Sequence, residues 1–135
     1  MATVTTTVSL TSAAGDLITD AITLSDSKAI TIANMATTGL ARAKVSATAV
    51  HASATVLYTA DDYAAGPYLY IKNTATTAGH KIYVYDDTTS GDHIQFQLDA
   101  EDWGFIPMHG DKTYKAYSPG GNDPVVEFMV MGKDQ

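Results

Sequence analysis

The four histidines are the first residues whose chemistry could define a site, because imidazole is both a metal ligand and an acid–base group. They are His51, His80, His93 and His109. They are well separated, and none belongs to an H-x-H, H-x-x-x-H or H-E-x-x-H pair. Cupin-like barrels take two ligands from one strand, two residues apart, and this chain lacks that spacing. The pattern favours solvent-exposed histidines beside turns, and a small metal enzyme of cupin type is the weakest of three functional hypotheses.

Carboxylates are the second candidate chemistry. They cluster as Asp61-Asp62, as Asp86-Asp87 with Asp92, and as Asp99, Glu101 and Asp102. Oxygen-rich loops can hold Ca²⁺, and the Asp86–Asp92 loop is the best candidate, although no D-x-D-x-D-G loop is present. Aspartate also favours turns, and paired-carboxylate glycoside hydrolysis needs a cleft for which 135 residues leave little room. The carboxylates therefore predict turns and solubility, with no metal site assigned.

Other catalytic signatures are missing from the sequence. It contains no cysteine, no G-x-S-x-G elbow and no P-loop. We therefore expect no enzyme and no cofactor.

The eight tyrosines could instead build a surface. Tyr68/Tyr70 and Tyr83/Tyr85 each occupy one face of a predicted strand, two residues apart. If those strands are neighbours, the four rings come together as a cross-strand ladder or an inter-subunit surface. A platform on which carbohydrate stacks is the alternative.

Charge and hydropathy exclude further classes. Fifteen acidic against eight basic residues give a net charge of −7, which argues against binding the nucleic-acid backbone. No apolar run approaches the roughly 18 residues that a membrane-spanning helix needs. The segment Met1–Thr6 has neither the basic nor the apolar stretch of a signal peptide. We expect neither nucleic acid nor membrane as a partner.

The two halves of the chain differ in composition. Every aromatic residue lies between Tyr58 and Phe128, whereas residues 1–57 consist largely of Ala, Thr, Ser and Val. Such small side chains bury little area each, so residues 1–57 must pack on the aromatic half, on another copy or on a partner. We predict one β-sandwich domain over residues 1–135, with 1–14 as an N-terminal arm or an edge strand.

Periodicity predicts strands almost everywhere. Val4, Val8 and Leu10 alternate with threonine and serine, a period of two that is rich in β-branched residues. Further strands are expected at Tyr68–Asn73, His80–Tyr85, His93–Leu98, Thr113–Tyr117 and Val125–Met131. Short turns join the first three of these, which predicts an antiparallel meander. Gly39–Ser53 is Ala-rich enough for a helix, but its alternation favours a strand. The fold class is all-β, an antiparallel β-sandwich or a jelly-roll-like arrangement.

Three segments of the second half carry a resemblance. They are Tyr68-Leu69-Tyr70-Ile71-Lys72-Asn73-Thr74, Leu98-Asp99-Ala100-Glu101-Asp102-Trp103-Gly104-Phe105-Ile106-Pro107 and Val126-Glu127-Phe128-Met129-Val130. Together they resemble small virion structural β-proteins of tailed bacteriophages, most of all capsid decoration (cement) proteins. The resemblance spans about half of the chain, and its motifs are structural. Glu101 stands where that group usually has glycine, so the turn before Trp103 is expected to differ.

The resemblance implies a function without catalysis. A decoration protein is a sandwich, typically a trimer, that stands on the outer capsid of the virion, binds the major capsid protein and bridges capsomers after assembly in the host cytoplasm. Met1–Leu10 would then add a strand to a neighbour's open edge, with Val4, Val8 and Leu10 as anchors. A tail or fibre component that binds a carbohydrate or receptor is the alternative, and the sequence leaves head and tail locations open.

Overall fold

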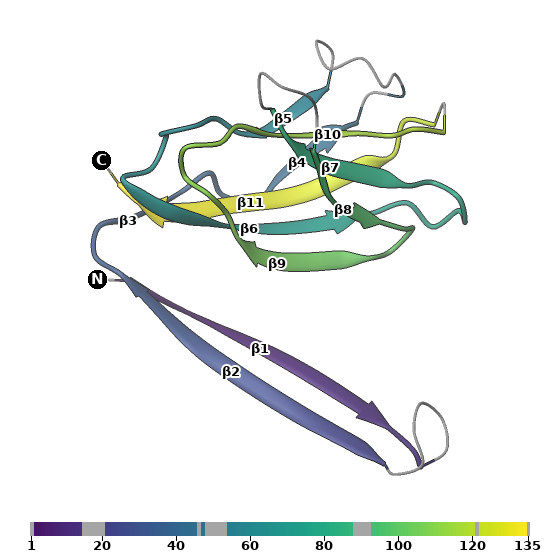
Figure 1. Ribbon diagram of the computed structural model, residues 1–135, viewed down its shortest axis with the longest axis horizontal. Coiled ribbons are helices and arrows are strands. Elements are labelled where there is room, and N and C mark those ends of the chain that lie inside the picture. Colours follow the sequence, from purple (N-terminus) through teal and green to yellow (C-terminus); the bar gives the residue numbers. More distant parts are fainter. Residues whose placement is uncertain are drawn as a thin grey trace. The chain divides into compact units, whose positions relative to one another are not determined.

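The computed structural model describes residues 2–14, 21–45, 47, 54–87, 93–120 and 122–134. These residues form eleven strands and no helix (Figure 1). By the contacts among its segments the chain divides into two units, Met1–Asn34 and Met35–Gln135. The all-β fold class is confirmed. A single domain over residues 1–135 stays a prediction, because the two units are described separately.

The first unit is a long antiparallel hairpin. Its strands are β1 (Ala2–Ser12) and β2 (Ile22–Ile32), and their register runs without a shift from Ala2 opposite Ile32 to Ser12 opposite Ile22. The two strands lie side by side along their full length (Figure 1). Alternating β-branched residues favour this extended backbone. The predicted N-terminal strand is therefore present, and its partner is β2.

A four-stranded sheet forms the first layer of the second unit. Its antiparallel order is β5 (Thr55–Tyr58), β10 (Tyr114–Tyr117), β7 (Ile82–Asp86) and β8 (His93–Leu98). Exposure alternates along β10, where Tyr114 and Ala116 are buried. This period of two is expected of a strand with one face against a core.

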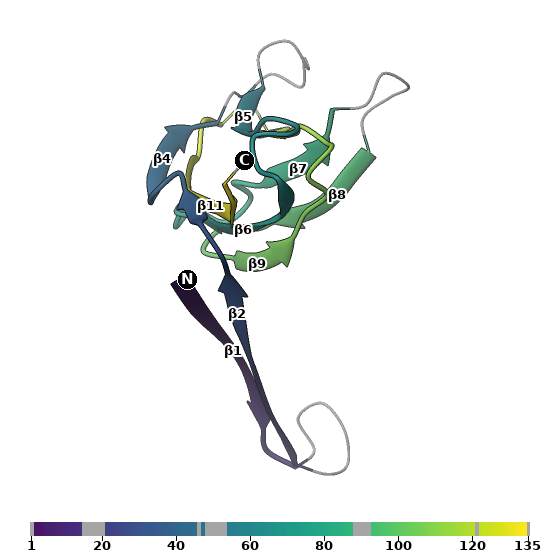
Figure 2. The same ribbon diagram turned by 90° about the vertical axis from the view of Figure 1, so that its left-hand side faces the viewer.

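A five-stranded sheet forms the second layer. Its strands are β3 (Met35–Thr37), β4 (Ala41–Lys44), β6 (Ala65–Asn73), β9 (Trp103–Pro107) and β11 (Val125–Lys133). The central strand β11 pairs with β6 on one side and with β3 and β4 in succession on the other, while β9 extends the sheet beyond β6. Figure 2 shows β4, β11, β6 and β9 on one side of this unit and β5, β7 and β8 on the other.

The hydrophobic core lies between the two sheets and contains residues of both. Leu69, Ile71 and Val126 come from one sheet, and Ile82 and Val84 come from the other; all five are fully buried. This packing of two antiparallel layers is a β-sandwich. The jelly-roll form of the prediction is not confirmed.

The predicted three-stranded meander is wrong. The segment Tyr68–Asn73 belongs to β6 of the five-stranded sheet, whereas β7 and β8 pair with each other in the four-stranded sheet. Only the second of the two expected hairpins therefore forms. Residues 74–81 cross between the layers because β6 takes β9 and β11 as its neighbours.

Asn73 secures this crossing. Its side chain is completely buried, and its amide nitrogen lies within hydrogen-bonding distance of three carbonyl oxygens: His80 at 2.7 Å, Leu98 at 3.3 Å and Asp99 at 3.0 Å. Its amide oxygen accepts from the backbone N–H of Ala75 at 3.1 Å. One side chain thus connects the end of β6 to the crossing segment and to the end of β8.

Glu101 occupies the turn between β8 and β9. Its φ of +66° lies in the left-handed region that glycine adopts most readily. The turn is closed by Asp102, whose carboxylate accepts from the backbone N–H of Asp99 at 2.9 Å and whose own N–H donates to the Asp99 carbonyl at 3.1 Å. Glutamate here adopts a backbone conformation that suits glycine, and the expected difference from the turn of virion proteins stays a prediction.

Candidate functional site

The hairpin has two chemically different faces. Residues opposite each other in an antiparallel pair share a face, and alternate residues of a strand change face. The register therefore places the larger apolar side chains of both strands on one face, together with Asp26 and Lys28. The other face, from Thr3 to Thr11 and from Thr23 to Thr31, carries threonine, serine and one alanine. We call these the apolar face and the hydroxyl face.

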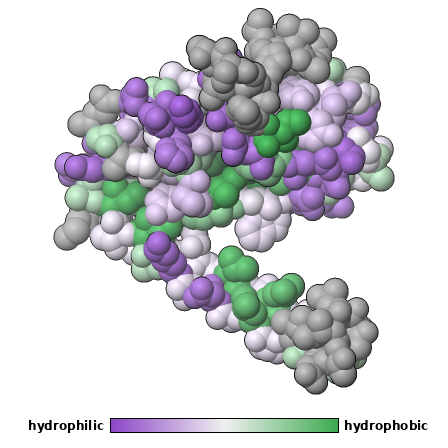
Figure 3. Space-filling view, viewed as in Figure 1, coloured by the Kyte–Doolittle hydropathy of each residue, from purple (hydrophilic) through white to green (hydrophobic). Residues whose placement is uncertain are grey.

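Several side chains of the apolar face are exposed. The exposed fractions are 59% at Val8, 48% at Leu10 and 50% at Leu24, whereas Val4 is half-buried and Ile30 is buried. Figure 3 shows apolar residues, in green, on the surface of the hairpin. A lone two-stranded hairpin is at best marginally stable in water. Of the predicted anchors, Val8 and Leu10 are thus available to a partner, and Val4 lies on the same face.

The four predicted tyrosines do not come together. Tyr68 and Tyr70 lie on β6, and Tyr83 and Tyr85 lie on β7 of the other sheet. The expected four-ring cluster is therefore wrong, and the reason is the assignment of β6 and β7 to different layers. Tyr83 and Tyr85 instead contact Tyr117 of β10 edge to face, with ring centroids 5.4 and 5.6 Å apart. Tyr85 is only 1% exposed, which removes it from any surface.

The outer side of the five-stranded sheet carries an aromatic surface. Leu69 and Ile71 point into the core, so the alternate residues Tyr68 and Tyr70 point outward. The register places Phe105 opposite Tyr70, and the rings of Tyr68 and Phe105 stack at 5.6 Å with an angle of 11°. We call the outward aromatic side chains of β6 and β9 the aromatic face. Its members are Tyr68, Tyr70, Trp103 and Phe105.

Sequence reasoning missed half of this face. Trp103 is 61% exposed at the edge strand β9, two residues from Phe105. The alternation of aromatic and smaller residues in Trp103–Pro107 was the available signal, because it places both rings on one side of a strand. The partners of Tyr68 and Tyr70 are therefore on β9 and not on β7.

An ion pair flanks the aromatic face. Arg42 of β4 donates from Nε and Nη2 to one carboxylate oxygen of Glu127, at 2.8 and 2.6 Å. The hydroxyl of Tyr70 donates to the other oxygen at 3.4 Å. The hydrogen bonds from Arg42 lower the pKa of Glu127, while burial, followed by the Glu127 charge, raises the pKa of Tyr70. Both pKa shifts favour a charged Glu127 and a neutral Tyr70 near neutral pH.

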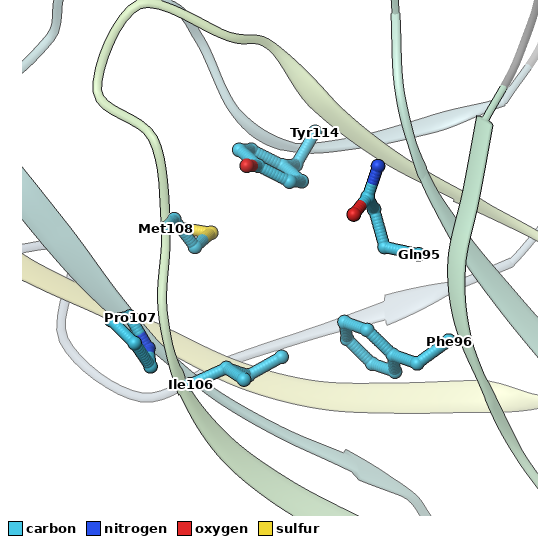
Figure 4. Close-up of a pocket in the computed structure, with 6 residues that line it drawn as sticks. All are labelled: Gln95, Phe96, Ile106, Pro107, Met108 and Tyr114. Carbon is cyan, nitrogen blue, oxygen red and sulfur yellow. The ribbon is translucent and has the colours of Figure 1, made fainter.

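A small cavity opens between the sheets, with a volume of about 160 Å³ (Figure 4). It is lined by Gln95, Phe96, Ile106, Pro107, Met108 and Tyr114. An apolar cavity of about 150 Å³ accommodates one benzene-sized group. The Tyr114 oxygen accepts from the backbone N–H of His109 at 3.2 Å. The lining therefore suits a single apolar side chain and contains no acid–base pair.

The candidate metal ligands, to which the sequence assigned no site, do not assemble within the part of the chain that the structure describes. Among the described residues, no group of three or more His, Cys, Asp or Glu side chains comes together. His51 and Asp92 lie outside those residues, and nothing is described of the His93 side chain. His109 is exposed and lies 3.3 Å from Asp111, and Asp87 pairs with Lys115 at 2.5 Å. His80 lies beside the Asn73 amide, to which its backbone carbonyl is bonded.

Comparison with known proteins does not assign the chain to a family. No protein-family model matches the sequence, and no curated protein is significantly similar to it. Within the described part of the chain, no helix is long and apolar enough to cross a membrane. A functional conclusion therefore depends on the apolar face of the hairpin and on the aromatic face. Of the two, the apolar face of the hairpin is the stronger indication of a binding surface.

Proposed function

We propose that this protein is a bacteriophage capsid decoration (cement) protein, which binds the outer head surface and stabilises the capsid by bridging capsomers. The observation that carries the proposal is the hairpin, whose strands of eleven residues expose Val8, Leu10 and Leu24 on one face. Such a surface is suited to attachment, because its apolar side chains gain stability only when a partner covers them. The resemblance of the second half to virion proteins agrees with this role.

The proposed partners are further copies of the chain, assembled as a trimer, and the major capsid protein of the same phage. Assembly would take place in the host cytoplasm, and the protein would end on the outer surface of the virion. A ligand that binds only the assembled shell stabilises it by RT ln(1 + [L]/Kd), about 2.7 kcal/mol at a concentration of 100 times Kd. Summed over many bound copies, this term raises the temperature at which the head opens.

The decisive experiment uses heads that lack the decoration protein. The purified protein is expected to co-sediment with them and to raise their melting temperature, measured by calorimetry. A double substitution Val8→Asp/Leu10→Asp, which places charges on the apolar face, is expected to lower head affinity by at least about tenfold, since burying an unpaired charge is costly. Thr7→Asp/Ser9→Asp introduces the same charges on the hydroxyl face of the same strand and is the matched control. If the native protein fails to bind, or binds without changing the melting temperature, the proposal is wrong.

The proposed trimer has its own measurement. Light scattering coupled to size-exclusion chromatography, at several protein concentrations, is expected to give a mass that approaches three times the chain mass of 14.3 kDa at the lowest concentrations. A monomer at every concentration would contradict a trimer in solution and would leave assembly on the shell to be read from the stoichiometry of decorated heads.

A phage tail or fibre component that binds a carbohydrate or receptor is the second candidate. The aromatic face favours it, because exposed rings such as Trp103 stack on the apolar faces of sugars. Trp103→Ala is then expected to abolish binding on a glycan array, whereas Tyr83→Ala on the other sheet leaves binding unchanged. An array on which the native protein gives no signal counts against this candidate.

A further inference from the structure

The sequence of β2 is self-complementary about its midpoint, Ser27. Read outward from this serine in both directions, Asp26 matches Lys28 and Leu24 matches Ile30. The remaining pairs are Ser25 with Ala29, Thr23 with Thr31, and Ile22 with Ile32. Each pair joins an acid to a base, two apolar residues or two small or hydroxyl-bearing residues. Such a strand can pair antiparallel with a copy of itself.

One edge of β2 is open to this pairing. In the described residues β2 belongs to a two-stranded sheet and pairs with β1 alone. The strand has no proline, and its register shows no bulge. Natural edge strands usually carry such features, or several charges, to prevent association. At about 3.4 Å per residue, eleven residues offer an edge about 37 Å long.

The charges determine the partner and the register. Asp26 and Lys28 are both exposed on the apolar face, and neither forms an ion pair with another described residue. In an antiparallel pair centred on Ser27, each Asp26 lies directly opposite Lys28 of the other copy, so two ion pairs form at once. A two-fold interface has this property, since each contact occurs twice. The strand β1 has no charged residue and therefore no comparable determinant.

We infer that β2 pairs antiparallel with β2 of a second copy of this chain, about a two-fold axis at Ser27. The result is a four-stranded sheet with the order β1, β2, β2 and β1. In this register an even-numbered residue of one copy always lies opposite an even-numbered residue of the other. The apolar faces of the two hairpins therefore join into one surface, and the hydroxyl faces join into another. On a phage head, each such contact would join one chain of a trimer to one chain of a neighbouring trimer. This last step rests on the proposed function.

A cysteine placed on the axis tests the register. The chain has no cysteine of its own, and in the proposed pair the Ser27 Cα atoms of the two copies lie about 5 Å apart. That distance is within the range of a disulfide. Oxidised Ser27→Cys is therefore expected to form a covalent dimer. Ser25→Cys, on the same face, is the matched control: its two copies lie four residues out of register, about 14 Å apart, and cannot be bridged.

Charge exchange tests the same contact without a cross-link. Asp26→Lys alone and Lys28→Asp alone place like charges directly opposite each other, and each is expected to weaken self-association by roughly tenfold. The double variant Asp26→Lys/Lys28→Asp keeps the net charge of −7 and restores both ion pairs. An equimolar mixture of the two single variants is expected to associate as well. Sedimentation velocity at low and high salt measures these affinities, and Glu101→Lys controls for net charge.

The outcomes separate this inference from the proposed function. Selective cross-linking at position 27, with rescue by the double exchange, supports the pairing whether or not heads are bound. Equal cross-linking at positions 25 and 27, or none at either, overturns it. The same holds if the single and double charge variants associate alike. Head binding by a Ser27→Cys protein that does not cross-link would leave the proposed function standing and remove the pairing.

Discussion

At the scale of single residues, Asn73 is the side chain that connects the most separate segments of the sandwich among those described above. Its buried amide reaches three carbonyl oxygens, one in the segment before β7 and two at the end of β8. Asn73→Ala removes the donor and leaves those oxygens buried without it, which is expected to destabilise the protein by about 2–4 kcal/mol. Urea unfolding followed by tyrosine fluorescence measures the loss. Gln97→Ala, at an exposed position of β8, should stay within about 0.5 kcal/mol of the native protein; a similarly small loss for Asn73→Ala would contradict the role assigned to it.

Glu101 is the residue at which a substitution is expected to improve stability. A non-glycine residue in the left-handed region costs about 1 kcal/mol or more, and Glu101 has a φ of +66°. Glu101→Gly should therefore raise the free energy of unfolding by up to about 1 kcal/mol. Gly79→Ala is the opposite change, at a φ of +90° with open space around the glycine, and should lower it. Thermal unfolding of both variants measures the two signs, and two shifts of the same sign would contradict the argument.

At the scale of elements, β11 and the segment before β6 are in close contact through Gly132. A Cβ built on this glycine would lie 2.7 Å from Cγ of Tyr63, whose ring stacks on Tyr58 at 5.9 Å. Gly132→Ala must therefore displace a packed ring, and we expect a loss of about 1–3 kcal/mol. Gly104→Ala on β9 is the matched control, because its new methyl would meet only Ile71 Cγ2 at 4.0 Å. Chemical unfolding compares the two variants; equal stability would show that the Tyr63 ring moves freely.

The elements also show what the sequence could and could not predict. Local alternation predicted strands at β1, β6, β7, β8, β10 and β11, because alternate residues of a strand face the core, as along β10. It did not predict β5 and β9. The layer to which each strand belongs depends on contacts far apart in the chain. Asn73 bonds to residues up to 26 positions away, and no local pattern reports such a bond. The expected cluster of four tyrosines was wrong because it made β6 and β7 neighbours, although they belong to different sheets. Val8 and Leu10 were correctly placed on one face, because both lie on the same strand.

At the scale of the whole molecule, the hydrophobic core and the exposed apolar face belong to different units. The residues of the core cluster lie between Val45 and Val130, all within the second unit. Among the described hairpin residues Ile30 is buried, but it does not belong to that cluster. The second unit therefore holds its own hydrophobic core, while the hairpin, with small or hydroxyl-bearing residues on one face, depends on a cover for the other.

This division predicts the result of removing the hairpin. A chain that begins at Met35 is expected to keep a cooperative unfolding transition within about 8 °C of the full chain, because a change below about 1 kcal/mol shifts the melting temperature of a domain of about 100 residues by no more than about 8 °C. Calorimetry and near-ultraviolet circular dichroism, which reports the packed aromatic rings, measure it. The shortened chain should also lose head binding and cross-linking, since both depend on β1 and β2. A fall of more than about 10 °C would instead mean that the hairpin contributes to the stability of its own chain, and its apolar face would then be covered from within and not by a partner.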